Sequence, residues 1–458
     1  MGRIENRIAL AAIVALGLAL RIAAGQGALW LDEAWSAVTA HEVGTPLGVF
    51  LKINHDNNHH LNTLWLQLVG LNAPPLLQRG LSIVTGTAAI WVAGLIGLRV
   101  NRMAGLCAAL LFAVSPLLVT YGAEARGYAP MVLALLAAVL IVARWLEDGK
   151  ARTIPLAVTV LCGMFSQLTM AFGLVAVALW AVFELRFVAR PARPWSEAAA
   201  ILVALLAPAA AAVALVLSAA GPKGLQFGSY EPFSWASLND GVTLMWKFAF
   251  GGLFLWLAGL FLVLVWPRER ARGGKPGGEL IVFALMALVP VGVALLQLGN
   301  SGTPRYYLVA GIGWLAIVAL RAGERVEAGG WRRIAAGVVM TAIVIASLAM
   351  DWTLIRDQRA DPGLALAAMR GRAPEGTSAA VDQARASAVL RMAAASSAYR
   401  LAVVETPCPA TRFLFIDRDG DQPFPDAPER CGAAYTVIAE AHPHSLSGTH
   451  WKLYERVR

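Results

Sequence analysis

Two adjacent carboxylates, Asp32 and Glu33, lie in the apolar stretch ALWLDEAWSAV, just beyond the first hydrophobic segment of the chain. An ionised carboxylate in apolar surroundings costs several kcal/mol unless it finds a partner, so the pair indicates a functional site. On a helix, Asp32, Trp35 and Ser36 share one face, whereas Glu33 points about 100° away. The two acids therefore need not have the same role. The alternative is a plain helix N-terminus, where the helix dipole favours acids.

The segment NHDNNHHLN, residues 54–62, places His55 and His59 four residues apart. That spacing on one helix face could chelate a divalent metal, although the sequence fixes no third ligand and contains no HExxH motif. Two other interpretations stay open. The histidines could form hydrogen bonds in a polar pocket, where Asp56 and Asn57 would suit sugar-like hydroxyls, or the segment could be a solvated loop.

A second charged segment, YGAEARGY, runs from Tyr121 to Tyr128 directly after an apolar run. Glu124 and Arg126 are two residues apart, so on a helix they diverge and reach different partners. Arg126 is suited to a phosphate, and Glu124 could pair with a base or hold Arg126. The alternative is an interfacial turn that the arginine and the tyrosines anchor at the membrane surface.

A third segment, GNSGTPRYYLV, places Arg305 and Tyr306 where another apolar run begins. A loop rich in glycine, serine and proline that ends in arginine is typical of a phosphate cradle, because guanidinium binds phosphate oxygens in bidentate fashion. The alternative is an arginine that only anchors the end of a helix.

The composition indicates which elements must position these residues. Hydrophobic residues make up 58% of the 458 residues and charged residues 15%, with a mean hydropathy of +0.61. Soluble domains contain roughly 25% charged residues, so this is a polytopic α-helical membrane protein. The net charge of +9 comes from short basic clusters between apolar runs, with no nucleic-acid-binding motif. This pattern argues against a nucleic-acid partner and for contact with membrane lipids.

Eleven apolar stretches, of about 17–23 residues, predict transmembrane helices. The first is read as a retained span, because no convincing signal-peptide cleavage site follows it. With a cytoplasmic N-terminus, every second connection carries the basic clusters, as the positive-inside rule requires. The spans lie near 8–24, 80–98, 104–121, 128–145, 154–169, 171–187, 197–219, 243–265, 280–298, 306–320 and 334–350.

The odd number of spans places the C-terminus and the tail, residues 351–458, on the outer side. Two helix-like segments in this tail precede four strand-like runs, near 400–404, 412–416, 434–440 and 451–457. We expect a small α+β domain there, next to a membrane domain of residues 1–350. The first outer segment of that membrane domain, residues 25–79, would lie along the bilayer interface.

The four cysteines divide between the membrane domain and the tail. Cys408 and Cys431 fall in the outer tail, where oxidising conditions would allow a disulfide worth about 3 kcal/mol. The alternative is two unpaired thiols. Cys107 and Cys162 lie within apolar spans and are most simply packing residues.

Four segments taken together resemble the GT-C class of integral-membrane glycosyltransferases. The chain is similar to the bacterial relatives of dolichyl-phosphate-mannose protein mannosyltransferases and of lipid A aminoarabinose transferases. The segments are LWLDEAWS, HDNNHHLNTLWLQLVG, SPLLVTYGAEARGYAP and, more loosely, PRYYL, and the resemblance covers roughly residues 1–320. Two patterns common in the family, HPPLYY and a His-Tyr pair after the fifth span, are replaced here by HHLNTL and SQLTMAF.

The resemblance implies a GT-C-like fold and an inverting sugar transfer on the periplasmic face of a bacterial inner membrane. By matching position, Asp32 would be the general base and Glu33 would support it. Glu124 and Arg126 would line the same cavity, and Arg305 would approach the lipid phosphate. The donor would be a polyprenyl-phosphate-linked hexose or pentose, and the acceptor an outer-leaflet lipid, a glycan or a protein.

Elementary chemistry supports this assignment. The outer leaflet has no supply of nucleotide sugars, so an activated donor must stay in the bilayer, and one carboxylate with arginines forms a minimal constellation for transfer. A transporter or flippase of a lipid-linked or polar solute is the main alternative. The absence of an internal repeat of broken helices, and the position of the acids in outer loops, favour the enzyme. A non-catalytic binding subunit is a third hypothesis.

Overall fold

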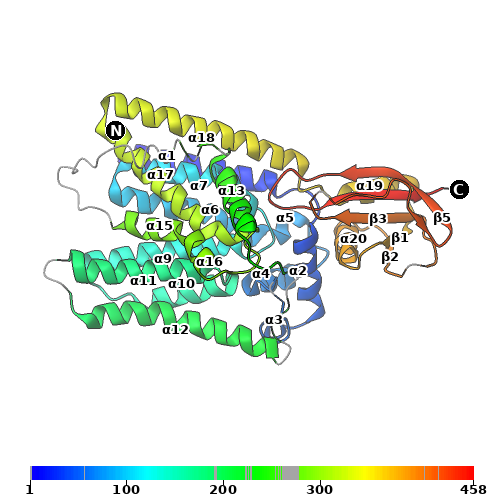
Figure 1. Ribbon diagram of the computed structural model, residues 1–458, viewed down its shortest axis with the longest axis horizontal. Helices are drawn as coiled ribbons and strands as arrows, with labels where there is room; N and C mark the ends of the chain where they lie inside the picture. The colour runs from blue at the N-terminus through cyan, green and yellow to red at the C-terminus, as the bar shows by residue number, and fades with distance from the viewer. Residues whose placement is uncertain are drawn as a thin grey trace.

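The computed structural model describes residues 3–457, except for 56, 190–192, 222–223, 225, 227–229, 253, 256, 258, 260–277, 407 and 421. The molecule is elongated and has two parts (Figure 1), a bundle of long helices and a C-terminal sheet domain beyond one end of the bundle. The chain is mostly helical, with a sheet domain at its C-terminus, as the sequence predicts.

The helices of the bundle are built mainly from alanine, leucine, valine and glycine, because a helix satisfies its own backbone hydrogen bonds in an apolar environment. In chain order they are α1 (Arg3–Ala24), α6 (Gly80–Val100), α7 (Arg102–Val114), α8 (Pro116–Gly122), α9 (Tyr128–Asp148), α10 (Thr153–Ser166), α11 (Met170–Phe183), α12 (Trp195–Ala220), α13 (Trp235–Phe250), α15 (Glu279–Ala287), α16 (Val289–Leu295), α17 (Leu308–Ala328) and α18 (Gly330–Asp357). Two short turns, a π-helix at Glu184–Val188 and a 3₁₀ helix at Pro304–Tyr307, extend α11 and precede α17.

Seven predicted spans are single helices long and apolar enough to cross a membrane, which makes the chain a multi-pass membrane protein. The predicted span 104–121 is a bent pair, α7 and α8, with an angle of 60° between them. The predicted spans 154–169 and 280–298 are shorter apolar helices, and 243–265 lies partly outside the described residues. The count of eleven therefore stays a prediction.

The bend between α7 and α8 follows from Pro116, which has no N–H to continue the hydrogen bonding of α7 and which starts the next helix. After α8 the chain makes a non-helical turn, residues 123–127, and then enters α9. Every residue from Leu111 to Val132 is buried. The turn is therefore held inside the protein, and it carries two of the predicted site residues.

Four short helices lie at the end of the bundle that is nearest the sheet domain (Figure 1), and α2 runs across that end. They are α2 (Leu31–Glu42), α3 (Pro46–Leu51), α4 (His60–Val69) and α5 (Pro75–Gln78). Large side chains on these helices, such as Leu47 and Leu68, remain exposed. This pattern fits the predicted interfacial segment 25–79.

The sheet domain contains α19 (Gly363–Arg372), β1 (Thr377–Val381), α20 (Arg385–Ser396), β2 (Leu401–Val404), β3 (Phe413–Arg418), β4 (Glu429–Arg430), β5 (Ala433–Ala441) and β6 (His450–Arg456). The strand order is β2-β1-β3-β6-β5-β4, with β1 parallel to both neighbours and the other pairs antiparallel. Strands β1 and β4 were not predicted, because TSAAV is short and mostly serine and alanine, and β4 has only two residues. A disulfide joins Cys408 and Cys431, whose Cα atoms are 5.7 Å apart.

Different connections between the helices lie at the two ends of the bundle. At the end nearest the sheet domain, Asp32, Arg126 and Arg305 come together from three connections predicted to lie outside. At the opposite end, Arg99 forms an ion pair of 2.6 Å with Glu279, between connections predicted to lie inside. The arrangement agrees with the predicted alternation of connections.

Candidate active site

Asp32 lies in the first turn of α2 and contacts two arginines. Its Oδ2 atom is 2.7 Å from Nη1 of Arg126 and 3.2 Å from Nη1 of Arg305. The three residues belong to three of the four segments that the sequence analysis singled out. The Asp32 side chain keeps 24% exposure, so an incoming group can still reach this carboxylate.

Asn57 connects Asp32 to Arg126. Its Nδ2 donates to the backbone carbonyl of Asp32 at 2.9 Å and to Oγ of Ser36 at 3.0 Å. Its Oδ1 accepts from Nη2 of Arg126 at 2.7 Å. Ser36 Oγ in turn donates to the Asp32 carbonyl, at 2.9 Å, one helical turn away. This network fixes the distance between the carboxylate and the guanidinium group.

Arg126 and Arg305 line a pocket with a volume of about 170 Å³. Two aromatic rings hold these cations, because Arg126 lies 5.0 Å from the ring centroid of Tyr128 and Arg305 lies 5.7 Å from that of Tyr306. The remaining lining residues are Ile53, His55, Asn58, His60, Met164, Gln167, Leu168, Thr169 and Val216. Two guanidinium groups beside apolar walls suit a phosphate that is attached to an apolar chain.

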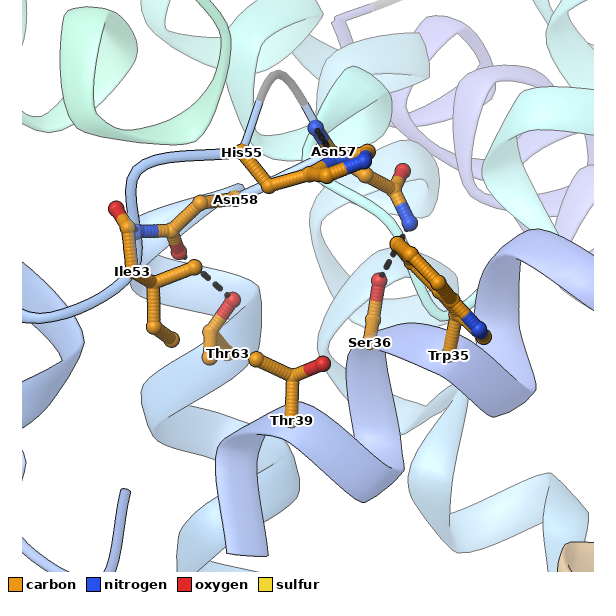
Figure 2. A pocket seen from close by; sticks show the side chains of 8 residues that line it. All are labelled: Trp35, Ser36, Thr39, Ile53, His55, Asn57, Asn58 and Thr63. Carbon is orange, nitrogen blue, oxygen red and sulfur yellow. Dashed lines mark hydrogen bonds between the residues drawn. The ribbon is translucent and has the colours of Figure 1, made fainter. Parts of the chain in front are cut away.

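A smaller pocket, of about 20 Å³, adjoins the first and shares Ile53, His55 and Asn58 with it (Figure 2). It has no charged side chain among its lining residues, which also include Trp35, Ser36, Thr39, Asn57 and Thr63. Amide and hydroxyl groups face it, and some are hydrogen-bonded to one another, as in the 3.1 Å bond from Thr63 to Asn58. Such groups suit an uncharged hydroxyl better than a phosphate.

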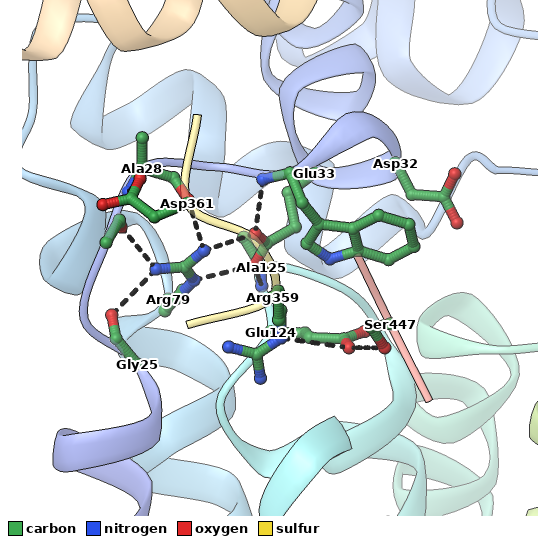
Figure 3. A network of polar contacts seen from close by, with 12 residues as sticks. Gly25, Ala28, Asp32, Glu33, Arg79, Glu124, Ala125, Arg359, Asp361 and Ser447 are labelled. Atoms are coloured by element: carbon green, nitrogen blue, oxygen red, sulfur yellow. Dashed lines mark hydrogen bonds and ion pairs between the residues drawn. The ribbon is translucent and has the colours of Figure 1, made fainter. Parts of the chain in front are cut away.

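Glu33 points away from Asp32 and is fully buried (Figure 3). Arg79 donates to both of its carboxylate oxygens, from Nε at 2.8 Å and from Nη2 at 2.6 Å. The backbone N–H groups of Ala125 and Trp30 donate to the same carboxylate, at 2.7 and 3.2 Å. Burial alone would raise the pKa of Glu33, but the ion pair with Arg79 holds the pKa below its ordinary value.

The expectation that Glu33 supports the base in the chemistry therefore disagrees with its surroundings, since Glu33 is fully buried and its carboxylate is occupied by groups of the protein itself. Glu33 accepts a hydrogen bond from the N–H of Trp30 at the N-terminus of α2, and this is the alternative role that the sequence analysis left open. Arg79 also donates to the carbonyls of Gly25, Gly27 and Ala28, at 2.8, 2.8 and 3.0 Å. The pair thus fixes the chain that leads into α2.

Glu124 is also fully buried and does not line the pocket, in contrast to its expected place in the cavity. Its Oε1 accepts a hydrogen bond from Ser447 and lies 3.6 Å from Nε of Arg359. Burial raises the pKa of Glu124. Tyr121 is buried as well, with its ring centroid 4.8 Å from that of Tyr128, so it supports the pocket wall from behind.

His55 and His59 do not form the helical pair on which the metal hypothesis depended, because α4 begins only at His60. His59 is buried with its Nδ1 3.1 Å from the carbonyl of Ser166, and burial lowers its pKa well below the ordinary value. His55 lines both pockets and packs against Trp35, with ring centroids 4.8 Å apart.

The described residues do not include a group of three histidine, cysteine or acidic side chains that could hold a metal ion. Asp32 is the open carboxylate, and the two guanidinium groups that contact it would repel a cation. These residues therefore do not fit a divalent metal. Asp56, the other acid predicted nearby, lies outside the described residues.

Several residues that build the site were not identified from the sequence. Arg79 had a signal, because a lone arginine at the outer start of a span departs from the positive-inside rule. Gln167 and Thr169 interrupt an apolar run in SQLTMAF, the segment where the chain differs from the family that it resembles. Arg359 and Ser447 had no local signal, since only the folded chain brings them to Glu124.

Comparison with known proteins gives one family match and several similar folds. Residues 58–212 match the family described as dolichyl-phosphate-mannose-protein mannosyltransferase. No curated protein matches the chain. The crystal structure of the Archaeoglobus fulgidus oligosaccharyltransferase tethered with an acceptor peptide containing the NVT sequon has a TM-score of 0.50 and 13% identity.

That match covers 87% of this chain and 64% of the oligosaccharyltransferase, so this chain spans less than two thirds of the length of that protein. The same oligosaccharyltransferase in complex with Zn and sulfate has a TM-score of 0.47 and 15% identity, over 89% of this chain and 68% of the other. Arg126 and the turn that carries it lie inside the family match. Residues 58–212 thus match the model of the dolichyl-phosphate-mannose-protein mannosyltransferase family, and the chain has a GT-C-like fold, in agreement with the resemblance that the sequence predicted.

Proposed function

We propose that the protein is a membrane glycosyltransferase that moves a hexosyl or pentosyl group from a polyprenyl-phosphate-linked donor to an acceptor. The observation that carries this proposal is the convergence of Asp32, Arg126 and Arg305 beside the pocket of about 170 Å³. The family match over residues 58–212 supports it independently of the geometry. By the positive-inside rule, the reaction takes place on the periplasmic face of a bacterial inner membrane, with the N-terminus in the cytoplasm.

In the proposed mechanism, Asp32 acts as the general base. It removes the proton from the acceptor nucleophile, which attacks the anomeric carbon from the face opposite the phosphate and inverts that centre. The bond between the anomeric carbon and the phosphate oxygen breaks, and its electron pair leaves with polyprenyl phosphate. Arg126 and Arg305 neutralise the charge that the phosphate gains, in a pocket where these donors are already in place.

The two pockets suggest how donor and acceptor are arranged. The arginine-lined pocket would hold the sugar phosphate, with Tyr128, Tyr306 and His55 on its walls. The smaller pocket, which has uncharged lining residues including Asn57, would face the acceptor. The proposed acceptor is an outer-leaflet lipid, a glycan or a protein.

Glu33 and Glu124 have positioning roles in this proposal. Glu33 accepts a hydrogen bond of 2.7 Å from the N–H of Ala125, one residue before Arg126. Glu124 fixes the same turn from its other side. The catalytic machinery would lie in the membrane domain, residues 1–350. The domain of residues 351–458 would be periplasmic.

The test is turnover by the purified protein in lipid nanodiscs, with a panel of polyprenyl-monophosphate sugars and a crude acceptor extract. The wild type is expected to release polyprenyl phosphate, and the active sugar identifies the donor. Release by neither the wild type nor any variant, with donor binding verified, would overturn the proposal. A transporter would bind the donor without breaking its glycosyl bond.

A further inference from the structure

The C-terminal domain touches the turn that carries Arg126. Ser447, in the loop between β5 and β6, donates a hydrogen bond to the buried carboxylate of Glu124 (Figure 3). The two residues are 323 positions apart, and both are buried. Glu124 is two residues before Arg126, so any shift of Glu124 is transmitted to the guanidinium group by a very short stretch of backbone.

Arg359 reaches the same turn from a second segment. Its side chain is 1% exposed, and its Nη1 and Nη2 donate to the carbonyls of Ala24 at 2.6 Å and Thr120 at 3.0 Å. Its Nε lies 3.6 Å from Glu124. Arg359 therefore ties the end of α1, the end of α8 and the Glu124 carboxylate together.

The backbone around Arg359 is held in an uncommon conformation. Gln358, Arg359 and Ala360 have φ angles of 44°, 59° and 58°, a left-handed run without a glycine. Non-glycine residues rarely adopt this conformation, and it persists only where the surroundings impose it. Trp451 contributes to those surroundings, because its Nε1 donates to the Ala360 carbonyl at 2.7 Å.

The loop with Ser447 is fitted closely to this left-handed run. Gly448 has a φ of +120°, and a Cβ at that position would lie 2.5 Å from the Arg359 carbonyl oxygen. Only glycine allows the two segments to approach so closely. The approach places Ser447 and Arg359 on the same carboxylate, although they come from opposite ends of the domain sequence.

We propose that Ser447 and Arg359 are positioning residues that act through Glu124 to hold Arg126 in the phosphate-binding pocket. The C-terminal domain is then part of the active-site framework rather than an appendage, in addition to any contact with the acceptor. This inference rests on the proposed function, because it is the phosphate-binding role of Arg126 that gives the contact a consequence.

Ser447→Ala in the full chain, in nanodiscs, tests the inference without knowledge of the sugar. Ser447→Thr keeps the hydroxyl, and Ser397→Ala is the matched control at an exposed serine of the same domain. Hydrogen exchange of the amides of residues 121–128 is expected to become at least tenfold faster in Ser447→Ala. It should stay unchanged in Ser397→Ala and be largely restored in Ser447→Thr.

The second measurement is the affinity for a polyprenyl monophosphate, the proposed leaving group, with Arg305→Lys as the reference for a damaged phosphate site. Ser447→Ala should bind this probe about five- to tenfold more weakly, under conditions where thermal unfolding shows that the variant is still fully folded. Unchanged exchange in Ser447→Ala overturns the inference. The inference is also overturned if exchange in Ser447→Ala is faster but its affinity for polyprenyl monophosphate is unchanged, while Arg305→Lys binds that probe weakly. If Arg305→Lys also binds like the wild type, the proposed donor site fails, and the exchange result alone decides whether the domain holds the turn.

Discussion

Asp32 and Glu33 are consecutive carboxylates on α2, yet they face different surroundings. Asp32 keeps 24% exposure and contacts two arginines that line a pocket. Glu33 is fully buried, and its carboxylate is occupied by one arginine and two backbone N–H groups. The helix produces this difference, because neighbouring residues project about 100° apart.

The comparison shows that an ionised group near a membrane can be retained for two separate reasons. The contacts of Glu33 are all with the protein itself, so its value is to fix the entrance to α2 and the turn before Arg126. Asp32 leaves room for a substrate, and its partners also line the pocket. Variants of the two acids should therefore fail in different ways, one in turnover and the other in folding.

Asp32→Asn is expected to have the largest effect. Removing the proposed base should lower turnover about 1,000-fold, within the usual range for general base catalysis. Folding and donor binding should persist, because asparagine has the same shape and the arginines remain for the phosphate. Release of polyprenyl phosphate measures this effect, with Asp426→Asn at an exposed acid as the control. Turnover above a tenth of the wild-type value would show that Asp32 is not the base.

Glu33→Gln should act on stability instead. It leaves the buried Arg79 without its anionic partner, and breaking a buried ion pair in this way costs about 3–5 kcal/mol. Unfolding in mixed micelles measures the loss, and Glu375→Gln, at an exposed position, should cost nearly nothing. Folded Glu33→Gln protein should retain most of its turnover. A stable variant with turnover as low as that of Asp32→Asn would mean that Glu33 takes part in the chemistry.

The same pair of residues shows what could be predicted from the sequence. Helical periodicity was enough to predict that Asp32 and Glu33 point in different directions, because that information is local. Alternation of the spans was enough to bring Arg126 and Arg305 to the end of the bundle that holds Asp32. The C-terminal α+β domain followed from composition and periodicity, except for β1 (Thr377–Val381) and β4 (Glu429–Arg430), whose patterns are too short.

Partners of buried charges could not be predicted, because side-chain packing decides them. Glu33 finds Arg79 at a separation of 46 residues, and Glu124 finds Ser447 at 323. The prediction that His55 and His59 share one helix face was also wrong for a packing reason. The chain turns at Asn57 and Asn58, whose side chains line the smaller pocket, before α4 begins. Local spacing has meaning only where the segment is really a helix.

Arg305→Lys tests whether the partners of Asp32 are chosen for their shape as well as their charge. Lysine keeps the positive charge but loses the planar, bidentate donor set that suits a phosphate. Turnover is expected to fall about 100-fold, a typical loss when one donor to a developing oxyanion is removed. Arg400→Lys, on the exposed surface, is the matched control. Equal turnover in both variants would remove Arg305 from the phosphate site.

His60 is the opposite case, because it is buried and has no ionic partner among the described residues. Its ring stacks on Phe50 at 5.1 Å, and burial lowers its pKa to about 4. The unfolded chain, with an ordinary histidine pKa near 6.5, takes up a proton first as the pH falls, so this residue's contribution to stability is lost on acidification between about pH 7 and pH 4. Between pH 7 and pH 5 the loss is about 2 kcal/mol. His60→Phe should reduce the pH dependence of the unfolding free energy by that amount, whereas an identical pH profile in wild type and variant would show that His60 titrates normally. A buried group thus keeps its charge only where the fold provides a partner, as Arg79 does for Glu33.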